Sequence, residues 1–353
     1  MSDPPCITNF RSRIRELLRE PVRQDARSAL VILAVDGIPA TLARRSWPRA
    51  RLETMRSVQP TTSSSAWLSA LSGMPVSNHG VPGVVFRDQS GTLINVFADA
   101  GTLAIPSAGT IFTDARDCGY TPVVVMGDLE SLNCSWRRAL LEGAEILSGF
   151  QFYSSPQPPE AAEVVAAVRT AIHAALSRTP DRPCLVWCFV DADLHIHKHG
   201  YDDALLKLLQ LLEQEALALA RSGVRVVAHS DHGLVLTTHS ADVEAVLKHA
   251  RTHLDCEVGG AGRTRWLYAP PGGAEQVADY LRSALPSSIR ICEASELFAA
   301  DSLAGQRIGQ ILLIAQADEF VTMPGYCYDH GSDTAEELFV PYAFWDPALV
   351  PRL

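Results

Sequence analysis

The stretch CLVWCFVDADLHIHKHG (residues 184–200) places two aspartates and three histidines directly after a run of apolar, strand-forming residues. The apolar run is typical of a buried strand, and the polar segment begins where that strand is expected to end. In parallel α/β sheets, ligands and catalytic groups collect at the carboxyl ends of the strands. The stretch therefore predicts a buried strand with a functional site at its end.

Similar apolar runs recur along the chain and alternate with amphipathic helical patterns. The strand-like runs cover residues 29–35, 122–127, 184–190 and 224–229, and the clearest helical patterns cover 159–178 and 203–222. Nearly continuous apolar strands separated by helices indicate a parallel sheet that is covered on both faces. We therefore expect an α/β fold with a mostly parallel central sheet and helices on both faces.

Residues 242–300 carry a different pattern, in which two helical segments alternate with the strand-like TRWLYA and IRIC and with a PPGG turn. This pattern predicts a small α+β cap inserted into the larger fold, lying over the site and setting the leaving-group preference. The expected organisation is an N-terminal helical segment at 1–27, a catalytic core at 28–241 and 301–353, and the cap at 242–300.

Composition limits the function classes. The chain has 353 residues, a net charge of −10 and no extended basic block, which argues against nucleic-acid binding. Its apolar runs are too short to cross a membrane, and the N-terminal segment lacks an apolar signal core. The eight cysteines are scattered without CxxC spacing, as expected of reduced thiols. We expect a cytoplasmic protein that acts on a small molecule; the sequence leaves its oligomeric state open.

Metal-ligand side chains follow three of the predicted strands. The strand at 29–35 ends in Asp36, the apolar run to 190 is followed by Asp193 and His197, and the next strand is followed by Asp231 and His232. Carboxylates and imidazoles from separate strand ends fit a zinc-type or mixed dimetal site.

Five motifs in this order carry a resemblance to a known family. They are Asp36-Gly37, PTTSSSAWLSALSGMPVSNHGVPG (60–83), Asp193-x-x-x-His197-x-x-Gly200, SDHG (230–233) and HGSDTAEELFVPY (330–342). Together they span nearly the whole chain. The chain resembles the alkaline phosphatase superfamily, and most closely its type I phosphodiesterase/nucleotide pyrophosphatase branch.

The resemblance implies two divalent metal ions. One would be held by Asp36, the nucleophile, Asp231 and His232, and the other by Asp193, His197 and His330. His330 is identified through the resemblance alone. Zinc is expected from the share of histidines, with manganese as the alternative.

The nucleophile falls in the serine-rich segment. Counting back from Trp67 and Gly73 at the family's spacing selects Ser63, and the neighbouring Thr62 is the alternative. The segment SSAWLSALSG predicts a helix, so the hydroxyl would lie at a helix N-terminus, where free N–H groups favour a phosphoryl oxygen.

Three further residues are expected near the substrate: Ser64, His195 and His199. The two histidines would face the substrate or orient metal ligands. A competing register pairs Asp191 with His195 at the same four-residue gap, but no glycine follows at the matching position.

The activity implied by the resemblance is hydrolysis of phosphodiester or pyrophosphate bonds through a covalent phosphoserine or phosphothreonine. The alternatives are a phosphomonoesterase of the same superfamily and a non-catalytic metal-binding member.

Overall fold

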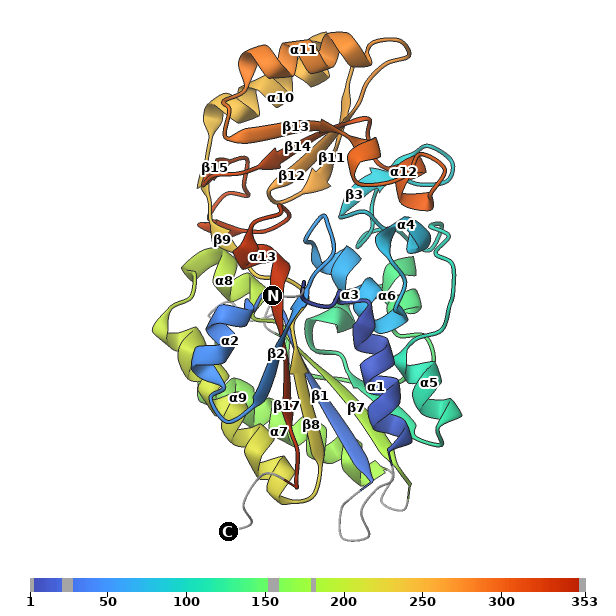
Figure 1. The fold of residues 1–353 in the computed structure, drawn as a ribbon, viewed down its shortest axis with the longest axis vertical. Coiled ribbons are helices and arrows are strands. Elements are labelled where there is room, and N and C mark those ends of the chain that lie inside the picture. Colours follow the sequence, from blue (N-terminus) through green and yellow to red (C-terminus); the bar gives the residue numbers. More distant parts are fainter. Residues whose placement is uncertain (1–2, 21–27, 152–158, 179–181, 349–353) are drawn as a thin grey trace.

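A computed structural model describes residues 3–20, 28–151, 159–178 and 182–348 (Figure 1). Its central sheet has seven strands in the order β2-β17-β8-β1-β7-β5-β6. Strands β8, β1, β7, β5 and β6 run parallel, and β17 is antiparallel to its neighbours β8 and β2. The expected α/β class with a mostly parallel sheet is therefore confirmed. The strands are β1 (Ala29–Val35), β2 (Arg51–Arg56), β5 (Thr121–Val125), β6 (Glu145–Leu147), β7 (Cys184–Val190), β8 (Arg225–His229) and β17 (Phe339–Trp345).

Alternate residues of the buried strands supply two separate hydrophobic cores. In β1, Leu30, Ile32 and Ala34 face one core, whereas the odd-numbered residues from Ala29 to Val35 face the other. Side chains alternate between the two faces of a strand, so an uninterrupted apolar run is required where helices cover both faces.

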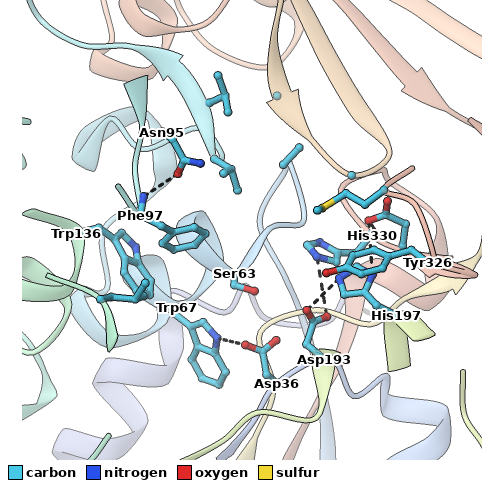
Figure 2. A pocket seen from close by; sticks show the side chains of 18 of the residues that line it. Asp36, Ser63, Trp67, Asn95, Phe97, Trp136, Asp193, His197, Tyr326 and His330 are labelled. Atoms are coloured by element: carbon cyan, nitrogen blue, oxygen red, sulfur yellow. Dashed lines mark hydrogen bonds and ion pairs between the residues drawn. The ribbon is translucent and has the colours of Figure 1, made fainter. Parts of the chain in front are cut away.

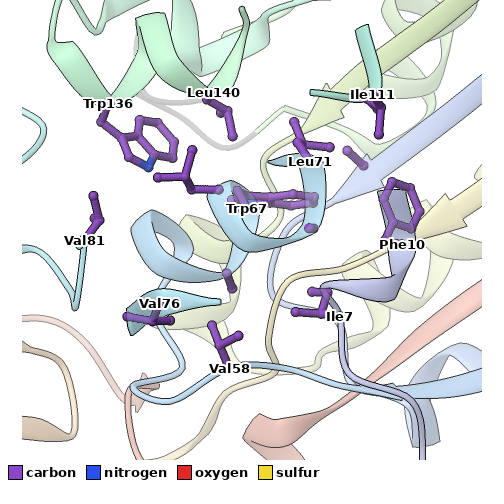
Figure 3. Packing of buried hydrophobic residues seen from close by; sticks show 14 of the residues in the cluster. Ile7, Phe10, Val58, Trp67, Leu71, Val76, Val81, Ile111, Trp136 and Leu140 are labelled. Carbon is purple, nitrogen blue, oxygen red and sulfur yellow. The ribbon is translucent and has the colours of Figure 1, made fainter. Parts of the chain in front are cut away.

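Helices cover each face of the central sheet (Figure 1). One core includes residues of α2 (Ala40–Ser46), α7 (Ala161–Arg178) and α9 (Asp203–Arg221). The other includes residues of α1 (Asn9–Arg19), α3 (Ser63–Ser72), α5 (Ile111–Asp117) and α6 (Ser135–Leu140). Figure 3 shows Trp67 of α3 packed between side chains of these segments, with Phe10 and Trp136 on either side.

A second, antiparallel sheet of six strands lies above the carboxyl ends of the central strands, in the order β13-β14-β12-β11-β3-β4. Helices α10 (Ala241–His253) and α11 (Ala274–Ala284) pack on it and enclose a third core. The strands are β3 (Val85–Arg87), β4 (Leu93–Asn95), β11 (Glu257–Ala261), β12 (Thr264–Tyr268), β13 (Ile289–Glu293) and β14 (Ile311–Ala315).

This second layer includes more of the chain than residues 242–300, which were expected to form it. Strand β14 lies between β12 and β13, and β3 pairs with β11. The hydrogen-bonding edges that a cap of 242–300 alone would leave open are satisfied by strands from distant parts of the sequence.

Short elements connect the two layers. Strands β9 (Val235–Leu236) and β16 (Tyr328–Asp329) pair with each other, as do β10 (Thr238–His239) and β15 (Glu319–Phe320). The short helices are α4 (Val76–His79), α8 (Asp193–His199), α12 (Leu303–Arg307) and α13 (Ala335–Leu338), with 3-10 turns at Gly127–Ser131 and Ala294–Glu296. In the part of the chain that the structure describes, no helix is long and apolar enough to span a bilayer.

Candidate active site

The three ligand-bearing strands end at the same level of the sheet. Val35 at the end of β1 pairs with Val190 at the end of β7, and Ala34 pairs with His229 at the end of β8. The polar residues that follow these strands are therefore neighbours in space, although they lie far apart in the sequence. The register of the parallel strands therefore brings the site residues together.

All six predicted carboxylate and imidazole ligands come together. Ligand atoms of Asp193, His197 and His330 lie within 4.8 Å of one another, and the same holds for Asp36, Asp193 and His232. Asp231 joins the second group, since its Oδ2 lies 3.2 Å from His232 Nε2. All six residues are buried. Figure 2 shows Asp36, Asp193, His197 and His330 around one end of a cavity.

Each of the three carboxylates has one oxygen in a close polar contact and one that accepts no hydrogen bond from the described residues. Asp36 Oδ2 accepts a hydrogen bond from Trp67 Nε1 at 3.0 Å, and Asp231 Oδ1 accepts a backbone N–H at 3.3 Å. Asp193 Oδ2 lies 3.0 Å from His197 Nε2. Their opposite oxygens are buried and have no hydrogen-bond partner among the described residues. Buried, unpaired carboxylate oxygens are costly unless a cation binds them, so the residues present fit divalent metal ions.

Two histidines are held by backbone carbonyls. The Nδ1 of His330 donates to the carbonyl oxygen of Thr61, and the Nδ1 of His197 donates to that of Tyr328, both at 2.7 Å. The opposite ring nitrogen of each histidine faces Asp193. The Nε2 of His330 lies 3.9 Å from Asp193 Oδ1, and the Nε2 of His197 lies 3.0 Å from Asp193 Oδ2. A backbone acceptor on one ring nitrogen fixes the tautomer and leaves the other as a metal ligand.

The pKa values of the site residues also favour the binding of cations. Burial, reinforced by Asp231 and Asp193, raises the pKa of Asp36 well above its ordinary value. Burial disfavours charge on His197, yet the charge and hydrogen bond of Asp193 raise its pKa to about 9. Without metal, protons therefore occupy positions that cations would take. If Asp36, Asp193 and Asp231 are all ionised, they carry three negative charges that divalent cations would offset.

The hydroxyl groups of Thr62 and Ser63 have different surroundings. Ser63 begins α3, lines the cavity and is partly exposed, and its Oγ lies 3.0 Å from His232 Nε2. Thr62 is fully buried, and its Oγ1 lies within 3.2 Å of the hydroxyls of Ser64 and Ser65. A nucleophile must reach the substrate, so the geometry favours Ser63 over Thr62.

The three residues expected near the substrate do not line the cavity. The hydroxyl of Ser64 faces Thr62 in the protein interior. His195 Nε2 lies 2.9 Å from Asp202, and its ring lies 4.8 Å from that of His199. Because α8 is helical, residues two positions from Asp193 point to the opposite side, away from the metal ligands.

The cavity has a volume of about 830 Å³ and two unlike walls. The wall opposite the metal ligands is largely apolar, and the second sheet contributes residues 258–262 of β11 and the turn after it. The apolar residues that line the cavity include Leu93, Phe97, Leu129, Leu132, Trp136 and Phe189. Figure 2 shows Phe97 and Trp136 across from His330, with Ser63 between the two sides.

Several cavity residues were not singled out from the sequence as functional. Asp191 was considered only as an alternative register; it lines the cavity beside the ligands. Tyr326 lies just before the motif that contains His330, and this position in the sequence could have indicated that it is near the site. Phe97 and Trp136 come from connecting segments, where the sequence carried no local signal.

A hydrogen-bonded junction fixes His330 between the two layers. The backbone N–H of Arg263, at the tip of the β11–β12 hairpin, donates to the His330 carbonyl at 2.7 Å. Thr264 Oγ1 donates to the Gly331 carbonyl at 2.6 Å. The Gly331 N–H donates in turn to Thr61 Oγ1 at 3.0 Å. The second layer is thus bonded directly to the loop that carries His330, a candidate metal ligand.

Solved structures of other proteins share the fold of this chain. No protein-family model matches the chain, and no curated protein sequence does. The assignment of the fold therefore rests on solved structures.

Two of these structures represent different enzymes. Murine ectonucleotide pyrophosphatase/phosphodiesterase 5 aligns with a TM-score of 0.61 at 14% identity, over 89% of this chain and 87% of that one. Phosphonoacetate hydrolase from Sinorhizobium meliloti 1021, solved with phosphonoformate, aligns with a TM-score of 0.65 at 19% identity, over 91% of this chain and 90% of that one. The likeness extends over nearly the full length of both.

Proposed function

We propose that this protein is a metal-dependent hydrolase of phosphodiester or pyrophosphate bonds that acts through a covalent phosphoserine at Ser63. The observation that carries the proposal is the position of the Ser63 hydroxyl, 3.0 Å from His232 Nε2 and at the edge of the Asp36, Asp193 and His232 group. A hydroxyl on a cavity wall beside ligands for two cations is the arrangement that metal-assisted phosphoryl transfer requires.

The proposed ligands are Asp36, Ser63, Asp231 and His232 for one ion. For the other they are Asp193, His197 and His330. When bound, two divalent cations would lower the pKa of the hydroxyl and neutralise charge on the phosphoryl oxygens. Zinc is proposed because three of the six carboxylate and imidazole ligands are histidines, and manganese is the alternative.

The protein's own residues account for the two steps. Ser63 Oγ attacks phosphorus, the O–P bond to the serine forms, and the bond to the leaving group breaks on the opposite side. Water then attacks the phosphoserine, releases phosphate or a phosphomonoester, and restores the hydroxyl. Burial lowers the pKa of His232 well below its ordinary value, so its imidazole is neutral and can serve as a cation ligand beside Ser63. Trp67 holds Asp36 in place through its indole N–H.

The cavity supports a substrate with a second organic group on the phosphorus. Its apolar wall can pack against the organic group that a diester carries in addition to its leaving group. Among the structural neighbours, an inactive variant of the murine phosphodiesterase was solved with AMP, and the hydrolase with phosphonoacetate. A small molecule with a phosphorus-centred anion is the substrate class that these ligands and this cavity share.

The proposal is tested by comparing bis-p-nitrophenyl phosphate with p-nitrophenyl phosphate on protein loaded with zinc or manganese. A phosphodiesterase is expected to have a higher kcat/KM on the diester and to lose activity with a chelator. A preference for the monoester would support the phosphomonoesterase alternative. Metal-loaded protein that cleaves neither compound would favour a non-catalytic metal-binding role.

A further inference from the structure

Tyr326 lies against the metal-binding end of the cavity and is not assigned a role by the motifs. It belongs to the segment between β15 and β16. Its ring stacks on that of His197 with centroids 4.0 Å apart and planes 22° from parallel. His197 is itself held by a backbone carbonyl. The tyrosine ring is therefore placed by a side chain that is already fixed.

The hydroxyl group of Tyr326 is available to a bound molecule. The residue lines the cavity, and its hydroxyl has no hydrogen-bond partner within the described parts of the chain. Figure 2 shows the ring over His197, with its hydroxyl end on the side that faces Ser63. A phenol is protonated at neutral pH, so this group offers a neutral donor beside the position where the substrate would react.

Other donors at this end of the cavity are already engaged. The indole N–H of Trp67 is bonded to Asp36, and the Nδ1 of His197 and of His330 are bonded to backbone carbonyls. Of the two cavity-lining arginines, Arg265 donates to carbonyl oxygens of its own hairpin, whereas Arg251 belongs to α10 of the second layer and its side chain makes no hydrogen bond within the described residues. The Tyr326 hydroxyl is free by comparison.

We propose that the Tyr326 hydroxyl donates a hydrogen bond to a nonbridging oxygen of the phosphoryl group that Ser63 attacks. The inference rests on the function proposed above and adds a catalytic residue to it. Charge builds on the phosphoryl oxygens during transfer, and a fixed donor in a sheltered site stabilises that charge without reorganisation. A neutral donor also avoids repulsion with adjacent cations, which a lysine or arginine would suffer.

The test uses Tyr326→Phe in metal-loaded protein. The phenylalanine keeps the ring stacked on His197 and removes only the hydroxyl, so metal content should stay at the wild-type value. The kcat/KM for bis-p-nitrophenyl phosphate should fall about 10- to 100-fold, as expected for one hydrogen bond to a charged group. The affinity for inorganic phosphate, measured by calorimetry, should fall as well.

A matched control removes a hydroxyl elsewhere. Tyr280 lies in α11 on the outer side of the second layer, where its ring stacks on His249. Tyr280→Phe should leave metal content, phosphate affinity and kcat/KM unchanged.

Sulfur substitution of a nonbridging substrate oxygen tests the contact directly. Sulfur accepts hydrogen bonds poorly, so the phosphorothioate analogue should slow the wild type by a larger factor than it slows Tyr326→Phe. Equal factors in both proteins would contradict the contact.

Two further results would overturn the inference. One is a Tyr326→Phe variant whose kcat/KM and phosphate affinity equal those of the wild type. The other is loss of bound metal in Tyr326→Phe, which would place the hydroxyl's role in the metal site rather than at the substrate. If the metal-loaded wild type neither cleaves the diester nor binds phosphate, the proposed function itself fails, and this result is distinct from a failure of the Tyr326 variant alone.

Discussion

The Nδ1 of His330 donates a hydrogen bond to the carbonyl oxygen of Thr61 at 2.7 Å, although the two residues are 269 positions apart. Ser63 lies two residues beyond Thr61. The same threonine bonds through Oγ1 to the N–H of Gly331 and the carbonyl of Ser332. A candidate metal ligand and the candidate nucleophile are thus held by one loop contact, and displacing either should disturb the other.

Replacing Ser63 with alanine should abolish turnover while the fold and the metal content remain. The hydroxyl lies at a partly exposed helix start, so its loss costs little stability, but the phosphoserine cannot form. A loss of kcat on the order of 10³-fold or more is expected. Steady-state kinetics and elemental analysis measure the two effects.

Thr62→Ala is the matched variant. Its hydroxyl is buried against Ser64 and Ser65, so its removal should cost about 1 kcal/mol of unfolding free energy. Turnover should persist. An inactive Thr62→Ala beside an active Ser63→Ala would move the nucleophile by one residue and leave the metal site unchanged.

His330→Ala should lower metal stoichiometry from about two per chain towards one and reduce turnover severely. The site that it shares with Asp193 and His197 would keep only two protein ligands. High added zinc should restore part of the activity. His239→Ala is the control, because His239 is exposed and lies 3.2 Å from Glu244. Unchanged binding of two metals by His330→Ala would exclude His330 as a ligand.

Gly262→Ala should displace His330 without altering any metal ligand. A Cβ at position 262 would lie 1.9 Å from the His330 carbonyl oxygen. The variant should bind the metal held by His330 more weakly and lose activity with it. Gly272 is the control, since it also has a positive φ but has nothing within 4 Å of its Cβ position. Gly272→Ala carries comparable backbone strain, so equal loss of metal in both variants would contradict this role of the hairpin.

Metal uptake at pH 7 should release protons. In metal-free protein the pKa of His197 is raised from 6.5 to about 9, so its imidazole is protonated at pH 7 and must lose that proton to bind a cation. Metal affinity should therefore increase as the pH rises towards 9. Calorimetric titrations in buffers of different ionisation enthalpy measure the protons released. No release, together with an affinity independent of pH, would contradict the ligand role of His197.

The raised pKa of His197 also determines how the stability of the metal-free protein changes with pH. The folded pKa of His197 lies above its ordinary value of 6.5, so the pair with Asp193 stabilises the fold below that pH. This contribution should be lost as the pH rises through about 9, and urea unfolding with a chelator present at pH 6 and pH 9 measures it. The loss is specific to the pair if Asp193→Asn removes the difference.

The local sequence was sufficient to predict four of the seven central strands, β1, β5, β7 and β8, and the candidate ligands that follow three of them. Asp36, Asp193 and Asp231 each follow a buried strand, and parallel strands bring their carboxyl ends together. His330 follows a two-residue strand, which is too short to give a periodic signal. Only the motif resemblance could select it before the structure.

Other features depended on contacts that the sequence does not encode locally. Strand β3, which pairs with β11, and strand β14, which pairs with β12 and β13, lie outside residues 242–300, so pairing rather than sequence pattern sets the extent of the second layer. His195 and His199 were expected near the substrate because they share a segment with Asp193 and His197. In a helix, positions two apart point to different sides, and recognising α8 as helical would have separated the two pairs.

The six-stranded sheet affects how this protein could be re-engineered or diversified. The chain enters that sheet at two separate places, through β3 and β4 and again through β11 to β14. Deleting residues 242–300 would leave β14 without partners and β3 paired only with β4, and it would remove the hairpin that holds His330. This region is therefore not an interchangeable module. The turn around Gly272, where a larger side chain meets no neighbour, is the better graft point for new segments. Changes confined there would spare the metal ligands.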